Sequence, residues 1–371
     1  MTNLNRASRQ WATRPADERF QTMQGLKKAV DDRFGCSIEN SFSFDGFSVE
    51  GAGNGEVVFR PSAEIPPFKM TNWAFGQLAG MAHAPAQYLR TLSPDLASNC
   101  LNFSIGKVSR NGGGSGGTKM LAVASADGDP MVRAFTSLNY GRIWDHQLVE
   151  AAMNLQQRNP SWKNPPARKI SGDGSGEETE NAGLYASDRD VFIFLVDENH
   201  KIQMPGKDGD LLSRGFFVWN SEVGSATFGM TTFLYRYVCG NHIVWGAEQV
   251  HEIRIRHTSH APERAFVEVL PALNAYLESS ASAEESVLKR ASDKMLPRGE
   301  GEAVDFMAKY GFTKAEANAS IEYAKAEEGD ARTLLQIVNG ATAYARDRAH
   351  TDARVVIERK AGKLLQGVSL N

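Results

Sequence analysis

Cysteine and histidine side chains gather in one stretch of the chain, YRYVCGNHIVWGAEQVHEIRIRHTSH, which runs from Tyr235 to His260. This stretch holds one of the three cysteines and four of the eight histidines. Cys239 and His242 have the CxxH spacing that forms half of many zinc sites, and His257 and His260 could supply a second pair. A thiolate of Cys239 activated by His242 would be a nucleophile. These residue types could therefore form either a metal site or a cysteine nucleophile.

Strand geometry argues against a metal site in this stretch. Zinc ligands must converge to about 2.0–2.3 Å from one point. If residues 243–257 form a straight strand, His251 and His257 are separated by roughly 20 Å at about 3.3 Å per residue. Both would lie on the face of Ile253 and Ile255, which is typical of a half-buried strand. The spacing favours an ordinary strand, although a site completed by a distant cysteine stays open.

The four residues from Cys239 to His242 also fit a tight turn between two strands. Gly240 and Asn241 are residue types that tolerate positive φ in hairpin turns. Cys239 would then be a small buried side chain, which is how most free cysteines behave. We predict a strand pair, 228–238 and 243–257, with no metal, no cofactor and no catalytic residue, which favours a protein that is not an enzyme.

Bulk composition sets broad limits on function. The net charge is −3, with 42% hydrophobic and 23% charged residues, which is ordinary for a globular protein and argues against a broadly basic nucleic-acid coat. Three widely spaced cysteines are typical of a reducing cytoplasm. The N-terminus has no apolar core of a secretory signal, and no run reaches about 18 apolar residues. We expect a cytoplasmic protein that does not enter a membrane.

The order of apolar patterns predicts an α+β fold. Helical spacing is expected over 16–34, over 72–92 with a break near Pro85, and over 142–156. Residues rich in aromatic and β-branched side chains predict the strands 101–108, 119–125, 191–196, 215–223, 228–238 and 243–257. The glycine run 112–117 lacks the GK[ST] order and the helix of a phosphate loop, and favours a flexible hairpin loop.

The pattern changes from strands to helices near Pro262. Thr313 and Glu316 form a capping box at the start of one of these helices, and 352–366 predicts the last. We expect a body of residues 1–261, built on a mixed or antiparallel sheet with flanking helices. It carries an exposed polar insertion near 157–188 and is followed by a helical region, 262–371.

Two segments resemble a known family. The first is GFFVWNSEVGSATFGMTTFLYRYVCGNHIVWG, and the second is MVRAFTSLNYGRIWDHQLVEA. They resemble phage- and plasmid-borne proteins of unknown function, in which an Asn-Ser-Glu-x-Gly segment precedes a strand and a Cys-x-Asn turn. The matching residues are Asn220, Ser221, Glu222, Gly224, Arg236, Cys239 and Asn241. The sequence departs from the pattern at His242, which counts against a metal role for that residue. The resemblance implies a bacterial host cell and a mobile element, but no mechanism.

Arginines and aromatic residues are interleaved in the same segments. Nucleic-acid surfaces combine positive charge with stacking platforms, which makes candidates of Arg133, Tyr140, Arg142, Arg236, Arg254 and Arg256. The alternative is that the aromatic residues are core and the arginines are solvated. Asn220 to Gly224 are either a polar contact site or an ordinary β-turn.

Three functions follow from these observations. The first is a noncatalytic DNA-transaction protein that binds or anneals single-stranded DNA as an accessory in replication or recombination. The second is an interaction protein that blocks a host defence or competitor system through a host or phage protein. The third, a metal-dependent enzyme, is disfavoured because the candidate ligands do not converge. Homo-oligomerisation is compatible with all three.

Overall fold

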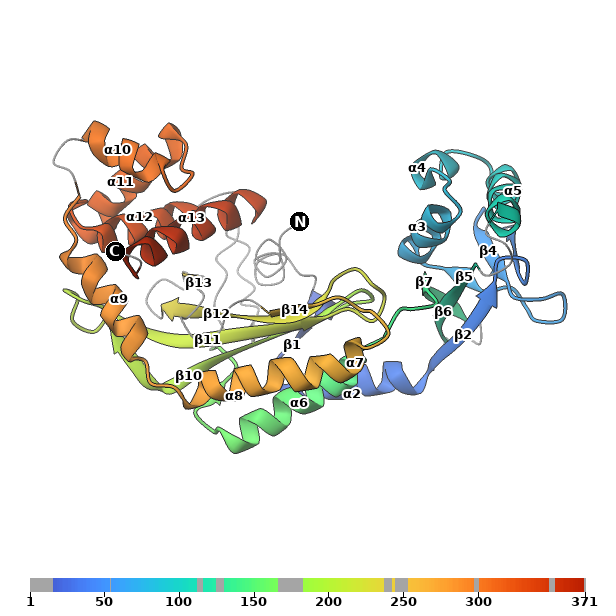
Figure 1. Cartoon of the computed structure of the whole chain (residues 1–371), viewed down its shortest axis with the longest axis horizontal. Helices are drawn as coiled ribbons and strands as arrows, with labels where there is room; N and C mark the ends of the chain where they lie inside the picture. Colours follow the sequence, from blue (N-terminus) through green and yellow to red (C-terminus); the bar gives the residue numbers. More distant parts are fainter. Residues whose placement is uncertain are drawn as a thin grey trace.

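The computed structural model describes residues 16–53, 55–111, 116–124, 130–165, 183–236, 242–243, 253–296, 300–346 and 351–369. The chain forms an elongated molecule with three parts (Figure 1). The N-terminal lobe comprises residues 37–137, the middle part is built on a long antiparallel sheet, and the C-terminal lobe comprises residues 282–369. Helices pack beside antiparallel and mixed sheets in the first two parts and form the third alone, which confirms the predicted α+β class.

The central sheet is a meander of three long strands. These are β10 (Val191–Gln203), β11 (Leu211–Asn220) and β12 (Phe228–Arg236), each antiparallel to the next. The shorter strands complete the sheet at its margins: β1 (Arg19–Phe20), β8 (Trp162–Lys163), β9 (Leu184–Ala186), β13 (His242–Ile243) and β14 (Ile253–Ile255). Both β13 and β14 pair antiparallel with β12, which confirms the predicted pairing for Ile243 and for 253–255, whereas Arg256 and His257 lie beyond the end of β14.

Helices cover one face of the central sheet. They are α2 (Met23–Gly35), α6 (Asp145–Arg158), α7 (Ala261–Arg264), the π-helical turn η2 (Ala265–Val269) and α8 (Leu270–Glu278). Figure 1 shows α2, α6 and α8 side by side along the sheet. Every second residue of β10, namely Val191, Ile193 and Leu195, packs in the core under these helices. Because α7 and α8 share this core, the helices that follow the sheet begin as part of its packing.

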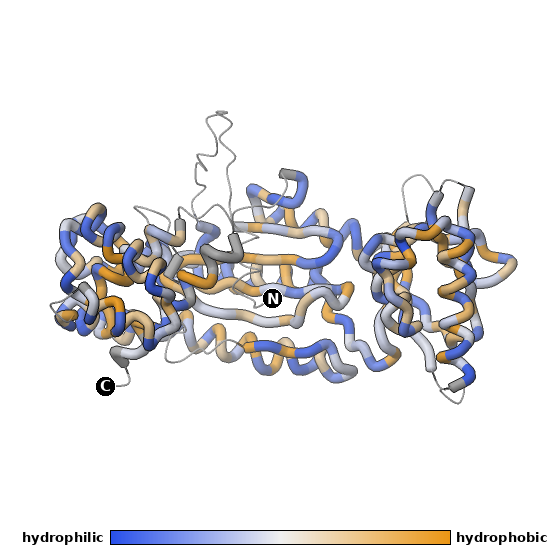
Figure 2. Tube along the Cα trace, turned by 90° about the horizontal axis from the view of Figure 1, so that it is seen from above, coloured by the Kyte–Doolittle hydropathy of each residue, from blue (hydrophilic) through white to orange (hydrophobic). Residues whose placement is uncertain are grey.

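The opposite face of the sheet is lined with aromatic rings. The side chains that alternate with the helix-facing residues form a second cluster: Tyr185, Phe192, Phe194, Phe217, Trp219, Phe233 and Tyr235. All of them are buried, so they are core residues rather than an open stacking surface. A strand that is apolar on both faces reads as a continuous hydrophobic run, which is visible as the orange strands in Figure 2.

The N-terminal lobe has its own sheet and its own core. The sheet contains β2 (Ser37–Ser43), β6 (Gly117–Val123), β7 (Met131–Ser137) and β5 (Lys69–Met70), and a separate hairpin pairs β3 (Ser48–Gly51) with β4 (Val57–Arg60). Three helices cover them: α3 (Asn72–Met81), α4 (Ala86–Leu89) and α5 (Pro94–Asn111). The break between α3 and α4 falls near Pro85, as predicted.

Two linked sequence predictions in this lobe are wrong. Residues 101–108 lie within α5 and not in a strand, so they do not form a hairpin with β6. Leu101, Phe103 and Ile105 alternate with polar residues as in a strand, but only Leu101 and Ile105 are buried. Phe103 is 69% exposed on the outer side of the helix. A helical face formed by Ala97, Leu101 and Ile105 provides the true periodicity.

The C-terminal lobe is a helical bundle. It contains α9 (Ser282–Asp293), α10 (Glu300–Ala308), α11 (Lys314–Glu328), α12 (Leu334–Arg346) and α13 (Thr351–Ser369). The predicted capping box is confirmed, because Thr313 Oγ1 accepts from the Glu316 amide at 3.2 Å and Glu316 Oε2 accepts from the Thr313 amide at 2.7 Å. Within the described ranges, no helix has the length and apolarity required to cross a membrane.

Candidate functional site

The loop that follows β11 connects the central sheet to the N-terminal lobe. It is the Asn-Ser-Glu-x-Gly segment, and its backbone is held by side chains from the lobe and from the link that follows it. Tyr140 Oη donates to the Ser221 carbonyl at 2.9 Å. Trp73 Nε1 and Gln77 Nε2, both on α3, donate to the Val223 carbonyl at 2.9 and 2.8 Å. Gly224 has a φ of 75°, a conformation that favours glycine.

Glu222 is the centre of this loop's contacts. Its carboxylate lies 2.8 Å from Arg133 Nη1 of β7 and accepts from the Asp145 amide, at the start of α6, at 3.0 Å. Its backbone carbonyl accepts from Arg142. The Glu222 and Arg133 side chains are 1% and 4% exposed. One buried acid therefore joins the loop, the lobe sheet and the first turn of α6.

A second acid is buried beside Glu222. Asp145 Oδ1 accepts from Asn220 Nδ2 at 2.7 Å, and the same amide donates to the Ile143 carbonyl at 2.7 Å. Burial raises the pKa of Asp145 to about 8; the negative charge of Glu222 adds to the increase and Arg33 opposes it. Arg33 Nη1 lies 3.9 Å from Asp145 Oδ2, and that oxygen is buried without a hydrogen-bond partner.

Aromatic rings close the other side of the network. The Arg142 guanidinium lies over the rings of Tyr140 and Trp144, at 5.3 and 5.6 Å from their centroids. His257 stacks on Tyr140 at 4.9 Å, and its Nδ1 is 3.1 Å from the Gly141 carbonyl. Burial lowers the pKa of His257 to about 4, so the ring is neutral at pH 7 and Nδ1 carries the donated proton. The network is closed to solvent and acts as an internal junction.

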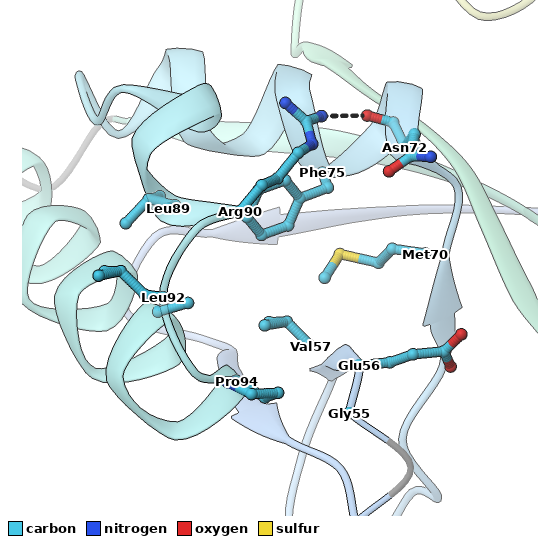
Figure 3. Close-up of a pocket in the computed structure, with 11 residues that line it drawn as sticks. Gly55, Glu56, Val57, Met70, Asn72, Phe75, Leu89, Arg90, Leu92 and Pro94 are labelled. Carbon is cyan, nitrogen blue, oxygen red and sulfur yellow. Dashed lines mark hydrogen bonds between the residues drawn. The ribbon is translucent and has the colours of Figure 1, made fainter.

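A cavity of about 300 Å³ opens in the N-terminal lobe, between the β4 and β5 strands and the three helices. Polar atoms make up most of its exposed surface, and its lining also includes seven apolar residues: Val57, Met70, Phe75, Leu89, Leu92, Pro94 and Ala97. Arg90 lies at its rim, with its guanidinium over the Phe75 ring at 5.1 Å and Nη2 donating to the Asn72 carbonyl at 2.8 Å (Figure 3). Apolar side chains beside a few positioned polar groups are typical of ligand sites.

Comparison with known protein families gives one match. Residues 167–355, more than half of the 371-residue chain, match the family model described as a domain of unknown function, DUF932. The chain belongs to the DUF932 family. A comparison with curated proteins and another with solved structures each gave no match.

The DUF932 match covers strands β9 to β14 of the central sheet and most of the C-terminal lobe, including the Asn-Ser-Glu-x-Gly loop. It does not include the N-terminal lobe or the partners that the lobe and the link to α6 contribute, Arg133, Tyr140, Arg142 and Asp145. The junction therefore joins a loop inside the matched region to residues outside it, and the cavity lies wholly outside.

The arginines that the sequence marked for nucleic acid do not share one groove in this DUF932 protein. Arg133, Tyr140 and Arg142 meet at the Glu222 junction, where all three are buried. Arg236 is buried at the other end of β12, where its Nε donates to Asp210 at 3.0 Å, and Glu328 lies 3.5 Å away. Arg254 and Arg256 are exposed on and just after β14. Buried, ion-paired guanidinium groups cannot reach a phosphate backbone.

The family-motif residues of this DUF932 protein also lie in more than one place. Asn220, Ser221, Glu222 and Gly224 form the junction loop, while Cys239 and Asn241 lie outside the described residues. In the part of the chain that the structure describes, no three histidine, cysteine, aspartate or glutamate side chains are placed to hold a metal.

The sequence did not predict the cavity. Residues 101–108 were expected to form a strand, so the helix α5, which forms one wall of the cavity, was not expected there.

Proposed function

We propose that this chain is a noncatalytic DNA-transaction protein of phage or plasmid type, which binds or anneals single-stranded DNA in the cytoplasm of a bacterial host. The observation that carries this proposal is a pair of exposed arginines, each stacked on an aromatic ring of α3. Arg90 lies over Phe75 at 5.1 Å, and Arg189 lies over Trp73 at 5.3 Å. The Arg189 side chain is 48% exposed.

These pairs have the composition that single-strand binding requires. A planar guanidinium on an aromatic ring offers both a charge for phosphate and a flat surface for a base. They replace the buried residues Arg133 and Arg142 as the candidate contacts. Arg254 and Arg256 remain candidates because they are exposed.

Salt-dependent binding tests the proposal. Fluorescence anisotropy with a labelled 30-nucleotide dT strand should show binding at about 50 mM salt that weakens steadily as salt rises, since each phosphate contact releases counterions. Arg189→Ala should weaken binding several-fold. Arg264→Ala is the matched control, because Arg264 is an exposed arginine already paired with Glu268 at 2.6 Å. Failure of the wild-type protein to bind the strand at low salt would overturn the proposal.

A second function is favoured by the outer face of α5. Leu96 and Phe103 are seven positions apart on one side of this helix and are 50% and 69% exposed. Exposed apolar side chains on a helix face are common at protein interfaces. An interaction protein that blocks a host defence or competitor system through this face would bind a host or phage protein. It would lose that binding in Phe103→Ser, measured by affinity capture of a specific partner against the wild-type chain.

A further inference from the structure

We propose that the cavity of the N-terminal lobe binds one unstacked nucleobase together with its adjoining phosphate. This inference rests on the proposed function and names the site where the strand would be gripped. A volume of about 300 Å³ is at the lower end for small-molecule sites, so the space suits a single base and not a duplex.

Apolar side chains in the cavity lining offer contacts for the face of a base, and the polar lining offers contacts for its edge. Val57, Met70 and Leu92 surround its open space, and Phe75 forms part of its wall beneath Arg90 (Figure 3). Phe75 and Leu89 are buried and therefore fixed, so the walls are preorganised. The Met70 thioether is polarisable and favours contact with aromatic rings. Base faces are flat and weakly hydrated, and their stacking on side chains is tolerant of sequence.

Arg90 supplies the charge and a second flat surface. Its guanidinium already uses one face to cover Phe75, at 5.1 Å, and one nitrogen to hold the Asn72 carbonyl, at 2.8 Å. Among the described residues Arg90 has no carboxylate partner, unlike Arg133, Arg214 and Arg236. Glu56 also lines the cavity, but its carboxylate extends away from Arg90 in Figure 3. An anionic group at the Arg90 rim is therefore not opposed by a facing carboxylate.

An exposed ring beside the cavity favours a strand over a free nucleotide. Tyr88 belongs to the same short helix, α4, as the wall residue Leu89, and it is 60% exposed. A neighbouring base of a strand could stack on this ring, whereas a mononucleotide would leave it unused.

Abasic strands separate recognition of bases from recognition of phosphates. Anisotropy is measured with dT20 and with a strand of equal length that carries abasic spacers in place of bases. The wild-type chain should prefer dT20 by about tenfold. Arg90→Ala and the cavity-filling Val57→Phe should abolish this preference. Arg90→Lys should also lose most of it, because it keeps the charge but not the planar surface. Arg110→Ala, an exposed arginine of the same lobe outside the cavity, is the charge-matched control and should bind as wild type.

The outcomes distinguish the two proposals. If the wild-type chain binds dT20 and the cavity variants keep the full preference for bases, the cavity assignment is overturned and the proposed function stands. If the wild-type chain binds neither strand and does not bind dTMP, both fail. Titration with dTMP by calorimetry identifies the source of the base: Arg90-dependent binding of dTMP without strand binding supports the cavity as a mononucleotide site. Circular dichroism of each variant confirms that it is folded.

Discussion

The carboxylate of Glu222 and the guanidinium of Arg133 form a buried ion pair at 2.8 Å. The two residues are separated by 89 positions in the sequence. Glu222 follows the central strand β11, and Arg133 is on β7 of the N-terminal lobe. The lobe is therefore held against the sheet by a charge pair as well as by hydrogen bonds to the loop backbone. Such a pair is costly to break from one side, since the remaining charge stays buried.

Replacing Glu222 with glutamine should strongly destabilise the fold. Glutamine keeps the size of the side chain and an acceptor for the Asp145 amide, but leaves the Arg133 charge unbalanced. We expect a loss of about 3–5 kcal/mol in the free energy of unfolding, measured by urea denaturation. Glu50→Gln is the matched control: Glu50 pairs with Arg60 at the surface, where its side chain is 42% exposed, so a loss of about 1 kcal/mol or less is expected. Equal losses in the two variants would contradict the role of the junction.

The buried Asp145 should make the protein less stable as pH rises from about 6.5 to about 8. Its folded-state pKa is raised from 3.8 to about 8, so the folded chain retains a proton that the unfolded chain releases. Stability therefore falls with rising pH across that interval, by up to about 1.4 kcal/mol per pH unit. Asp145→Asn cannot ionise and keeps an acceptor for Asn220. Its melting temperature should change less between pH 6.5 and pH 8, and a slope as steep as that of the wild type would refute this assignment.

His257 should produce the opposite dependence in acid. Its folded-state pKa is lowered from 6.5 to about 4, so stability is present above about pH 6.5 and is lost as pH falls towards 4. His257→Asn retains a donor that can reach the Gly141 carbonyl, but loses the stacking on Tyr140. We expect a lower melting temperature than the wild type at pH 7. Between pH 7 and pH 5 the protonation of Asp145 favours the folded state of both chains, but only the wild type loses the His257 contribution, so the melting temperature of the variant should change more favourably than that of the wild type. Equal changes in the two chains would show that another group is responsible.

The central sheet could be predicted from local patterns because each strand carries its own signal. In β10, Val191, Ile193 and Leu195 alternate with Phe192 and Phe194, and burial on both faces makes the run continuous. The same local rule failed for 101–108, where Phe103 lies on the exposed side of a helix but completes a false alternation. Two-residue and four-residue periodicities cannot be separated over so short a run.

The junction could be predicted only in part. The Asn-Ser-Glu-x-Gly segment was recognisable as a polar turn at a strand end, but the pairing of Glu222 with Arg133 joins two distant segments, and spacing carries no information about it. Arginines next to aromatic residues indicated a nucleic-acid surface, whereas the fold places Arg142 between two rings inside the protein. An Arg–aromatic pattern is the same in sequence whether it is buried or exposed, and only the fold distinguishes the two.

Close packing between β11 and β12 predicts that Gly229 cannot be replaced. Gly229 lies opposite Trp219 in the register, and an added Cβ would be 2.5 Å from Trp219 Cζ2 and 2.3 Å from the Ile253 carbonyl. Trp219 is fully buried in the aromatic cluster and cannot turn away. Gly229→Ala should lower the free energy of unfolding by at least about 1–3 kcal/mol, the usual range for overpacking. Gly106→Ala on α5, where nothing lies within 4 Å of the new Cβ, should instead stabilise the protein by about 0.5–1 kcal/mol. Thermal unfolding of the two variants checks both signs, and a neutral Gly229→Ala would mean that the tryptophan is not held against this backbone.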